Sequence, residues 1–99
     1  MKRRTSLTQS AAEELAIQAL TFIAGDGERL GRFLAATGIG PAEIRAAAEE
    51  PGFLTGVLEY LSGDERLLTD FAADAQIDPA EIGKALAALG SAGWERDRA

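Results

Sequence analysis

Carboxylates are the side chains through which this chain could do acid–base chemistry or hold a metal ion. They occur as neighbours three times, at Glu13 and Glu14, Glu49 and Glu50, and Asp64 and Glu65. The sequence contains no histidine and no cysteine, which excludes Ser-His-Asp triads, Cys-His pairs, and metal sites built on imidazole or thiolate ligands. Because no nucleophile can be paired with a base, the sequence predicts no enzyme activity, no catalytic residue, no metal site and no cofactor.

The segment GDGERL at residues 25–30 has the glycines and acids of a loop that binds phosphate or calcium. It lacks the Gly-Lys ending of a P-loop and the alternating acidic ligands of a calcium loop. A similar segment, GDERLL, follows at residues 63–68. We therefore predict that both segments join two helices. The first glycine of each, Gly25 or Gly63, then adopts the left-handed conformation at a helix end, and the aspartate after it caps the next helix.

Pro-Ala-Glu-Ile occurs twice, at residues 41–44 and 79–82. Proline suits the first position of a helix, because its fixed φ is helical and its missing N–H would have no partner there. The glutamate can bond back to the amide of the capping residue, which is Gly40 in the first copy and Asp78 in the second. The isoleucine begins the buried face. We interpret the motif as a helix start rather than as a binding signature.

The spacing of Leu34, Gly38 and Ile44 is similar to that of a helix-turn-helix, and residues 68–88 repeat it without the glycine. A helix that reads DNA presents Arg, Lys, Asn or Gln near its start. The helix expected after Gly38 presents mainly alanine and glutamate. Nucleic-acid binding by residues 30–50 or 68–88 is therefore the alternative function, and a helix-turn-helix shape without DNA binding is favoured.

Charge argues against nucleic acids and anionic membranes as partners. Residues 11–93 carry 14 acidic and 5 basic side chains, a net charge of −9, whereas Lys2, Arg3 and Arg4 are basic. A body this acidic repels phosphate groups. No apolar run approaches the roughly 18 residues needed to cross a bilayer. Since the basic start is not followed by an apolar signal segment, we expect a cytoplasmic protein.

The elements that must position these residues are expected to form two similar units of three short helices. Shifting the chain by 38 positions aligns residues 15–52 with 53–90, with identical residues at 13 of the 38 positions. The chain contains 20 alanines and 12 leucines but one valine, which is typical of helices rather than strands. The predicted fold is an all-α bundle of five to six short helices in one domain over residues 11–94. A basic flexible tail (residues 1–10) precedes it and a flexible tail (residues 95–99) follows it.

The second unit carries more apolar side chains than the first at three aligned positions. Arg29 aligns with Leu67, Ala48 with Leu86, and Pro51 with Leu89. The favoured interpretation is that these leucines fill the contact between the units. The alternative is an exposed partner-binding patch that receives a partner helix or a second copy of the chain. Its candidate residues are Tyr60, Leu67, Leu86 and Leu89.

The segments RFLAATGIGP, RAAAEEPGFL and VLEYLSGDE resemble those of a family of small α-proteobacterial proteins, the domain of unknown function 3572. The resemblance covers about residues 11–90, nearly the whole predicted domain. It implies a bacterial, cytoplasmic, all-helical protein, and it carries over no catalytic or binding residue.

The excluded classes leave interaction with another molecule as the main hypothesis for function. We expect a non-enzymatic module, a monomer or weak homodimer, that binds a protein partner in a helix-lined groove. A small-molecule pocket between the two units is a third hypothesis.

Overall fold

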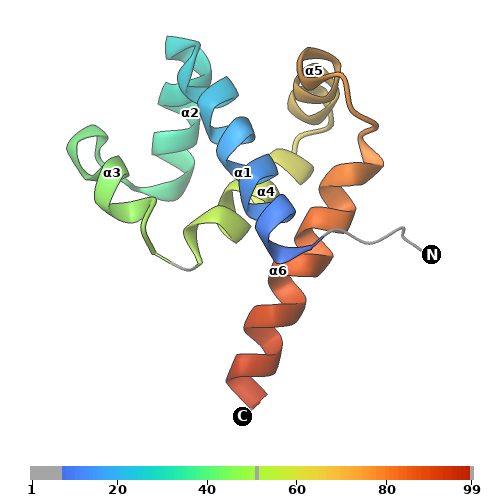
Figure 1. Cartoon of the computed structure of the whole chain (residues 1–99). Coiled ribbons are helices and arrows are strands. Elements are labelled where there is room, and N and C mark those ends of the chain that lie inside the picture. Colours follow the sequence, from blue (N-terminus) through green and yellow to red (C-terminus); the bar gives the residue numbers. More distant parts are fainter. Residues whose placement is uncertain (1–7, 51, 99) are drawn as a thin grey trace.

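The structure, a computed structural model, describes residues 8–50 and 52–98, and the side chains of residues 8–50 and 52–89. Every regular element in these residues is a helix, as Figure 1 shows. Their order is α1 (Gln9–Ala24), α2 (Gly27–Thr37), the 3₁₀ turn η1 (Pro41–Glu43), α3 (Ile44–Ala47), α4 (Phe53–Ser62), α5 (Glu65–Ala75) and α6 (Ala80–Arg98). The predicted all-α fold is confirmed.

Both ends of the helical body differ from the expected domain limits. α1 begins at Gln9, because the hydroxyl of Thr8 accepts a hydrogen bond from the Ala11 amide (3.0 Å) and caps the helix. α6 ends at Arg98, beyond residue 94, where the domain is expected to end. Residues 1–7 lie outside the described residues, and the flexibility of the two tails stays a prediction.

The two Gly-Asp junctions between helices differ from the prediction at the glycine. Gly25 and Gly63 have right-handed backbone angles (φ −73° and −77°), so the left-handed conformation predicted for them is wrong. The aspartate that follows makes the turn instead. Its backbone is extended, and its carboxylate accepts hydrogen bonds from amides of the next helix. The capping role predicted for Asp26 and Asp64 is therefore confirmed.

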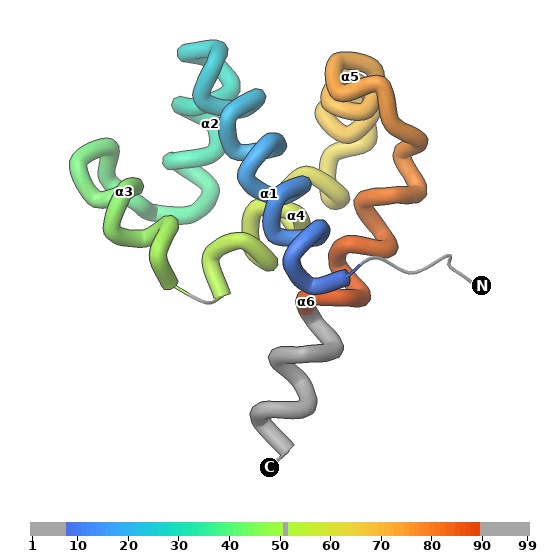
Figure 2. Tube along the Cα trace, viewed as in Figure 1, coloured from blue at the N-terminus to red at the C-terminus, as the bar shows by residue number. Residues whose placement is uncertain are grey.

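α1 lies at the centre of the molecule, and α4 and α6 pack against it (Figure 2). Three small side chains of α1, those of Ala12, Ala16 and Ala19, are fully buried. Small residues at a helix contact let the neighbouring helices approach closely, so larger side chains from both sides can fill the core. Those side chains are Val57, Leu58 and Leu61 from α4 and Ile82 and Leu89 from α6.

α2 and α5 join this core through aromatic contacts that cross between the two aligned halves of the chain. Phe22 of α1 contacts Phe71 of α5, with ring centroids 5.5 Å apart. Tyr60 of α4 contacts Phe33 of α2 in the same way, at 5.1 Å. The two pairs occupy aligned positions, 22 with 60 and 33 with 71. The halves therefore exchange equivalent contacts, as an approximate internal two-fold arrangement requires. Their origin in a duplication stays a prediction.

The third helices break this correspondence. In the sequence alignment of the halves, η1 and α3 of the first half correspond to α6 of the second. However, α3 has four residues and packs mainly against η1. Ile44 is half-buried, whereas its aligned residue Ile82 is buried in the core. The chain enters both third helices through a left-handed residue, Gly38 (φ 76°) in one half and Gln76 (φ 60°) in the other. Pro51 lies outside the described residues.

Pro-Ala-Glu-Ile lies at the start of the third helix in both halves, with different capping contacts. In the first copy the carboxylate of Glu43 accepts a hydrogen bond from the Gly40 amide at 3.1 Å. This is half of a capping box, because glycine has no side chain to complete it. In the second copy the carboxylate of Asp78 accepts a hydrogen bond from the Ala80 amide at 2.9 Å, while Glu81 pairs with Lys84 at 3.3 Å.

Candidate functional site

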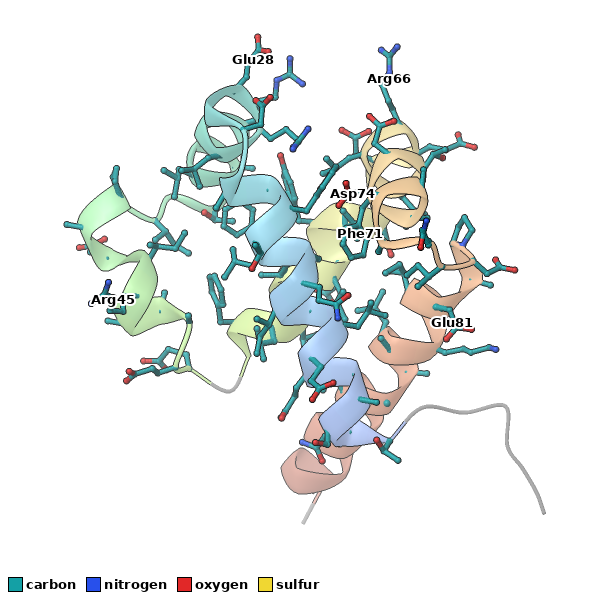
Figure 3. All side chains as sticks on the ribbon, turned by 45° about the horizontal axis from the view of Figure 1, so that its top comes forward. Glu28, Arg45, Arg66, Phe71, Asp74 and Glu81 are labelled. Atoms are coloured by element: carbon teal, nitrogen blue, oxygen red, sulfur yellow. The ribbon has the colours of Figure 1, made fainter. Side chains whose placement is uncertain are left out.

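A cleft of about 480 Å³ lies between α1 and α5 and reaches the start of α2. Its lining residues are Ile17, Gln18, Thr21 and Phe22 of α1, Gly25 directly after α1, Arg29 in the first turn of α2, and Phe71, Asp74 and Ala75 of α5. Figure 3 shows Phe71 and Asp74 on the side of α5 that faces α1. The cleft is therefore built by both aligned halves of the chain.

The apolar part of the cleft is an aromatic pair covered at one end by a guanidinium. Phe22 and Phe71 form the tilted ring contact that joins α1 to α5. The guanidinium carbon of Arg29 lies 3.9 Å from the centroid of the Phe22 ring, which is within the range of a cation–π contact. These three side chains hold α1, α2 and α5 together along one edge of the cleft.

Arg29 also completes the end of α1. Its Nε and Nη2 atoms donate hydrogen bonds to the carbonyl oxygen of Phe22, at 3.3 and 3.0 Å. The last carbonyls of a helix lack intrahelical partners and carry the negative end of the helix dipole, so a guanidinium there is favourable. The aligned residue, Leu67, is instead buried in the core. Of the two aligned residues Arg29 and Leu67, which differ in type, Arg29 is the one that lines the cleft.

Ile17 stands at the open side of the cleft. It is 51% exposed, and it is the one large apolar side chain in the exposed class among the side chains described. The hydroxyl of Thr21 donates a hydrogen bond to the Ile17 carbonyl (3.0 Å), so this polar side chain is bonded back onto its own helix. The cleft thus combines an exposed aliphatic side chain, an aromatic pair, and the exposed carboxylate of Asp74.

The structure does not bring the four candidate patch residues together on the surface. Leu67 and Leu89 are 9% and 8% exposed and belong to the core, while Leu86 is half-buried against it. Tyr60 is half-buried in its contact with Phe33. These positions agree with the favoured interpretation, in which the extra leucines fill the contact between the halves. They leave no exposed patch of the kind expected for the alternative.

The paired carboxylates are solvated or cap helices. Glu14, Glu49 and Glu50 are exposed, and Asp64 caps α5 by accepting a hydrogen bond from the Leu67 amide at 3.1 Å. No group of three or more His, Cys, Asp or Glu residues that could hold a metal ion is present in the part of the chain that the structure describes. The hydrogen bonds from the backbone amides of Arg29 and Glu28 hold the pKa of the Asp26 carboxyl below its ordinary value. Helix capping thus accounts for the two aspartates of the glycine-containing segments.

The helix-turn-helix candidates are also placed by the structure. The helix after Gly38 consists of η1 and the four residues of α3, whereas the helix after Gln76 is α6. α3 is shorter than two turns, so it offers few positions from which side chains could enter a groove. The exposed residues of the other helix near its start are Ala80, Gly83 and Lys84. Neither placement adds an observation in favour of nucleic-acid binding.

Sequence reasoning missed Ile17, Phe71 and Asp74 as site residues. Ile17 does carry a signal, because it lies off the buried face that runs through Leu15, Ala19 and Ile23. A large β-branched residue on the polar face of a helix has no core to fill. Phe71 and Asp74 carry no such signal, since their position beside α1 depends on how the two halves pack.

The fold and the cleft define a small all-helical protein with a partly apolar cleft that one carboxylate and one guanidinium line. A protein family described as "Protein of unknown function (DUF3572)" matches residues 9–92. The chain therefore belongs to this family, as the resemblance in its sequence implies. No curated protein and no solved structure matches the chain. Among the described residues, no helix combines the length and the hydrophobicity needed to cross a membrane.

Proposed function

We propose that this chain is a non-enzymatic interaction module that binds an apolar side chain of a partner protein in the cleft between α1 and α5. The observation that carries the proposal is the exposure of Ile17 beside the aromatic pair. A single exposed apolar residue is common on protein surfaces. Here an inserted side chain would meet Ile17 together with Phe22, whose ring packs on the buried ring of Phe71.

The available apolar surface limits what one inserted side chain can contribute. Covering the exposed half of an isoleucine is worth about 1 kcal/mol, whereas a micromolar complex needs about 8 kcal/mol. The partner must therefore make further contacts along α1 and α5. A helix lying in the groove provides such contacts, since it presents side chains at regular intervals along one face.

Binding accounts for the cleft better than catalysis or nucleic-acid recognition. The charged groups that line it are one carboxylate, Asp74, and one guanidinium, Arg29, which is already bonded to a backbone carbonyl. The net charge of −9 over residues 11–93 opposes a phosphate backbone. We propose a cytoplasmic protein that needs no cofactor and is a monomer or weak homodimer when free.

A site-specific crosslink tests this proposal. Because the chain contains no cysteine, Gln18→Cys would introduce a single attachment point for a photo-crosslinker. Gln18 is an exposed lining residue of the cleft, and its replacement leaves Ile17 in place. Ala73→Cys is the matched control, since Ala73 is exposed on α5 and does not line the cleft. In lysate of the source cells we expect a discrete crosslinked protein from position 18 and none from position 73. The same products from both positions, or none from position 18, would contradict the proposal.

A further inference from the structure

We infer that the partner segment is a basic amphipathic helix of about three turns, whose apolar face enters the cleft and whose lysines or arginines face the acidic walls. This inference rests on the proposed function, because it specifies the chemistry of the segment that the cleft binds. Three features of the described residues indicate this partner: the charges of α1 and α5, the hydrogen bonds that Arg29 already makes, and the length of α5.

The two helices on either side of the cleft, α1 and α5, carry more acidic than basic residues, although Asp74 is the one carboxylate among the described lining residues. α1 carries Glu13 and Glu14 and no basic residue, and α5 carries three acids against one base, Arg66. Asp74 lies in the cleft itself, and the salt bridges found among the described residues, Arg32–Glu28 and Lys84–Glu81, leave it without a basic partner. An exposed carboxylate at the edge of an apolar floor is complementary to a cation that flanks an apolar anchor.

Arg29 does not reverse this balance, although it lines the cleft. Two of its N–H groups are bonded to the Phe22 carbonyl, and its guanidinium lies over the Phe22 ring. Its charge is thus placed against the negative end of the α1 dipole. Asp74 is left as the charge that a partner meets in the cleft, and the other carboxylates of α1 and α5 lie on the helices beside it.

α5, which lines the cleft near its C-terminal end and continues beyond it, matches a short helix in length. α5 has 11 residues, so it extends about 16 Å at 1.5 Å per residue. A partner helix of about three turns can lie along it. Apolar residues at positions i, i+3 or i+4, and i+7 of such a helix form one face, and this face would meet the exposed Ile17 and the half-buried Phe22. Lysines on either side of that face would lie over α1 and α5.

Model peptides test the chemistry directly, with fluorescence anisotropy of a labelled peptide as the measurement. The probe is a helix-forming peptide with leucine at i, i+3, i+4 and i+7 and lysine elsewhere. One comparison peptide replaces every lysine by glutamate, and another scrambles the leucines and lysines. We expect the Leu/Lys helix to bind, the Leu/Glu helix not to bind, and the scrambled peptide to bind about tenfold more weakly. Equal binding of the scrambled peptide would overturn the inference, because the attraction would then be charge alone.

Two variants locate the binding. Asp74→Asn is expected to weaken the Leu/Lys helix about threefold at low salt and to reduce the salt dependence of binding. Glu49→Gln is the matched control and should leave binding unchanged, because Glu49 is an exposed carboxylate that follows α3 and does not line the cleft. Ile17→Ser is expected to weaken binding about fivefold at every salt concentration. An equal effect of Asp74→Asn and Glu49→Gln would overturn the inference.

The outcomes separate this inference from the proposed function. If position 18 crosslinks a partner but the Leu/Lys helix does not bind, the proposed function stands and the basic helix is wrong. If Ile17→Ser leaves the binding of the Leu/Lys helix unchanged, the cleft is not its site and the inference fails. Self-association of the chain that Ile17→Ser abolishes would identify a second copy as the occupant and would also overturn it.

Discussion

Arg29 joins three helices through one side chain. It belongs to α2, bonds the carbonyl at the end of α1, and covers the ring of Phe22, which in turn contacts Phe71 of α5. Each of these contacts is modest alone, since hydrogen bonds and cation–π contacts near a surface are each worth about 1 kcal/mol. Together they decide the shape of one end of the cleft.

Arg29→Ala is expected to lower the free energy of unfolding by about 2 kcal/mol, because it removes both the hydrogen bonding to the Phe22 carbonyl and the contact with the Phe22 ring. Arg29→Lys should recover part of this loss, because lysine keeps the charge but lacks the planar fork that bonds the carbonyl while lying on the ring. Urea unfolding measures both values. In the double variant with Phe22→Leu, the effect of Arg29→Ala should shrink. Additive effects would show that the ring contact does not contribute.

Gly31 offers a stabilising change at the same scale. It lies inside α2, and a Cβ built there would meet no atom within 4 Å. Because glycine inside a helix costs conformational entropy, Gly31→Ala is expected to raise the free energy of unfolding by about 0.5–1 kcal/mol. Gly38→Ala is the opposite control, since its φ of 76° strains any side chain. A loss of stability in Gly31→Ala would indicate a close neighbour at that surface.

At the scale of the elements, capping aspartates set where helices begin. Asp26, Asp64 and Asp78 each accept hydrogen bonds from the first amides of a helix. A carboxylate therefore fixes the start of a helix at three places. For two of these carboxylates, Asp26 and Asp78, the capping predicts a measurable effect on stability.

The capping of α2 makes stability depend on pH through Asp26. The backbone amides of Arg29 and Glu28 lower the folded pKa of Asp26 from its ordinary value of 3.8. A lowered folded pKa means that the contribution is complete above the unfolded pKa and is lost as the pH falls through the folded one. In Asp26→Asn, which can still cap but cannot titrate, unfolding from pH 6 to pH 2 should show a flatter pH dependence than in the wild type. Parallel curves would contradict the assignment.

The start of α6 provides a second test of capping. Asp78→Ala is expected to destabilise the protein by about 1 kcal/mol, because the Ala80 amide loses its acceptor. Glu81→Gln should cost less, about 0.3 kcal/mol, since Glu81 forms an exposed pair with Lys84. Thermal unfolding of both variants measures the difference. A loss of partner binding by Asp78→Ala without a loss of stability would contradict the structural role of the motif.

At the scale of the whole molecule, the two aligned halves are not separate bodies. The pairs Phe22–Phe71 and Tyr60–Phe33 both run from one half to the other, and α1 packs against α4 and α6 of the second half. Each half thus places its core residues in a shared interior, and neither half can bury them alone.

The shared core predicts one cooperative unfolding transition rather than two. Phe33→Leu and Phe71→Leu, which change aligned and buried residues, should each destabilise the protein by about 1 kcal/mol. Each variant should shift the same single transition in circular dichroism and calorimetry. Two transitions, with each variant moving a different one, would show that the halves fold independently.

Residue type predicts more of the fold than of the site. The helical composition, the capping aspartates and the helix start at Pro-Ala-Glu-Ile follow from local preferences, which act within a few residues. The backbone of Gly25 and Gly63 was beyond such reasoning, because either a left-handed glycine or an extended aspartate can end a helix and turn the chain. The packing of Leu67 and Leu89 into the core and the exposure of Ile17 depend on which helix faces cover one another.

The sequence by itself determined the helices, the order of their caps, and an acidic chain without the side chains of most catalytic and metal sites. These properties depend on residues close together in the chain or on composition, so they can be derived without knowledge of the tertiary structure. Only the tertiary structure decided that Phe71 and Asp74 meet Ile17 and Arg29 across one cleft. Residues 42 to 57 positions apart come together because two similar halves bury a common core, and that packing depends on helices from both halves.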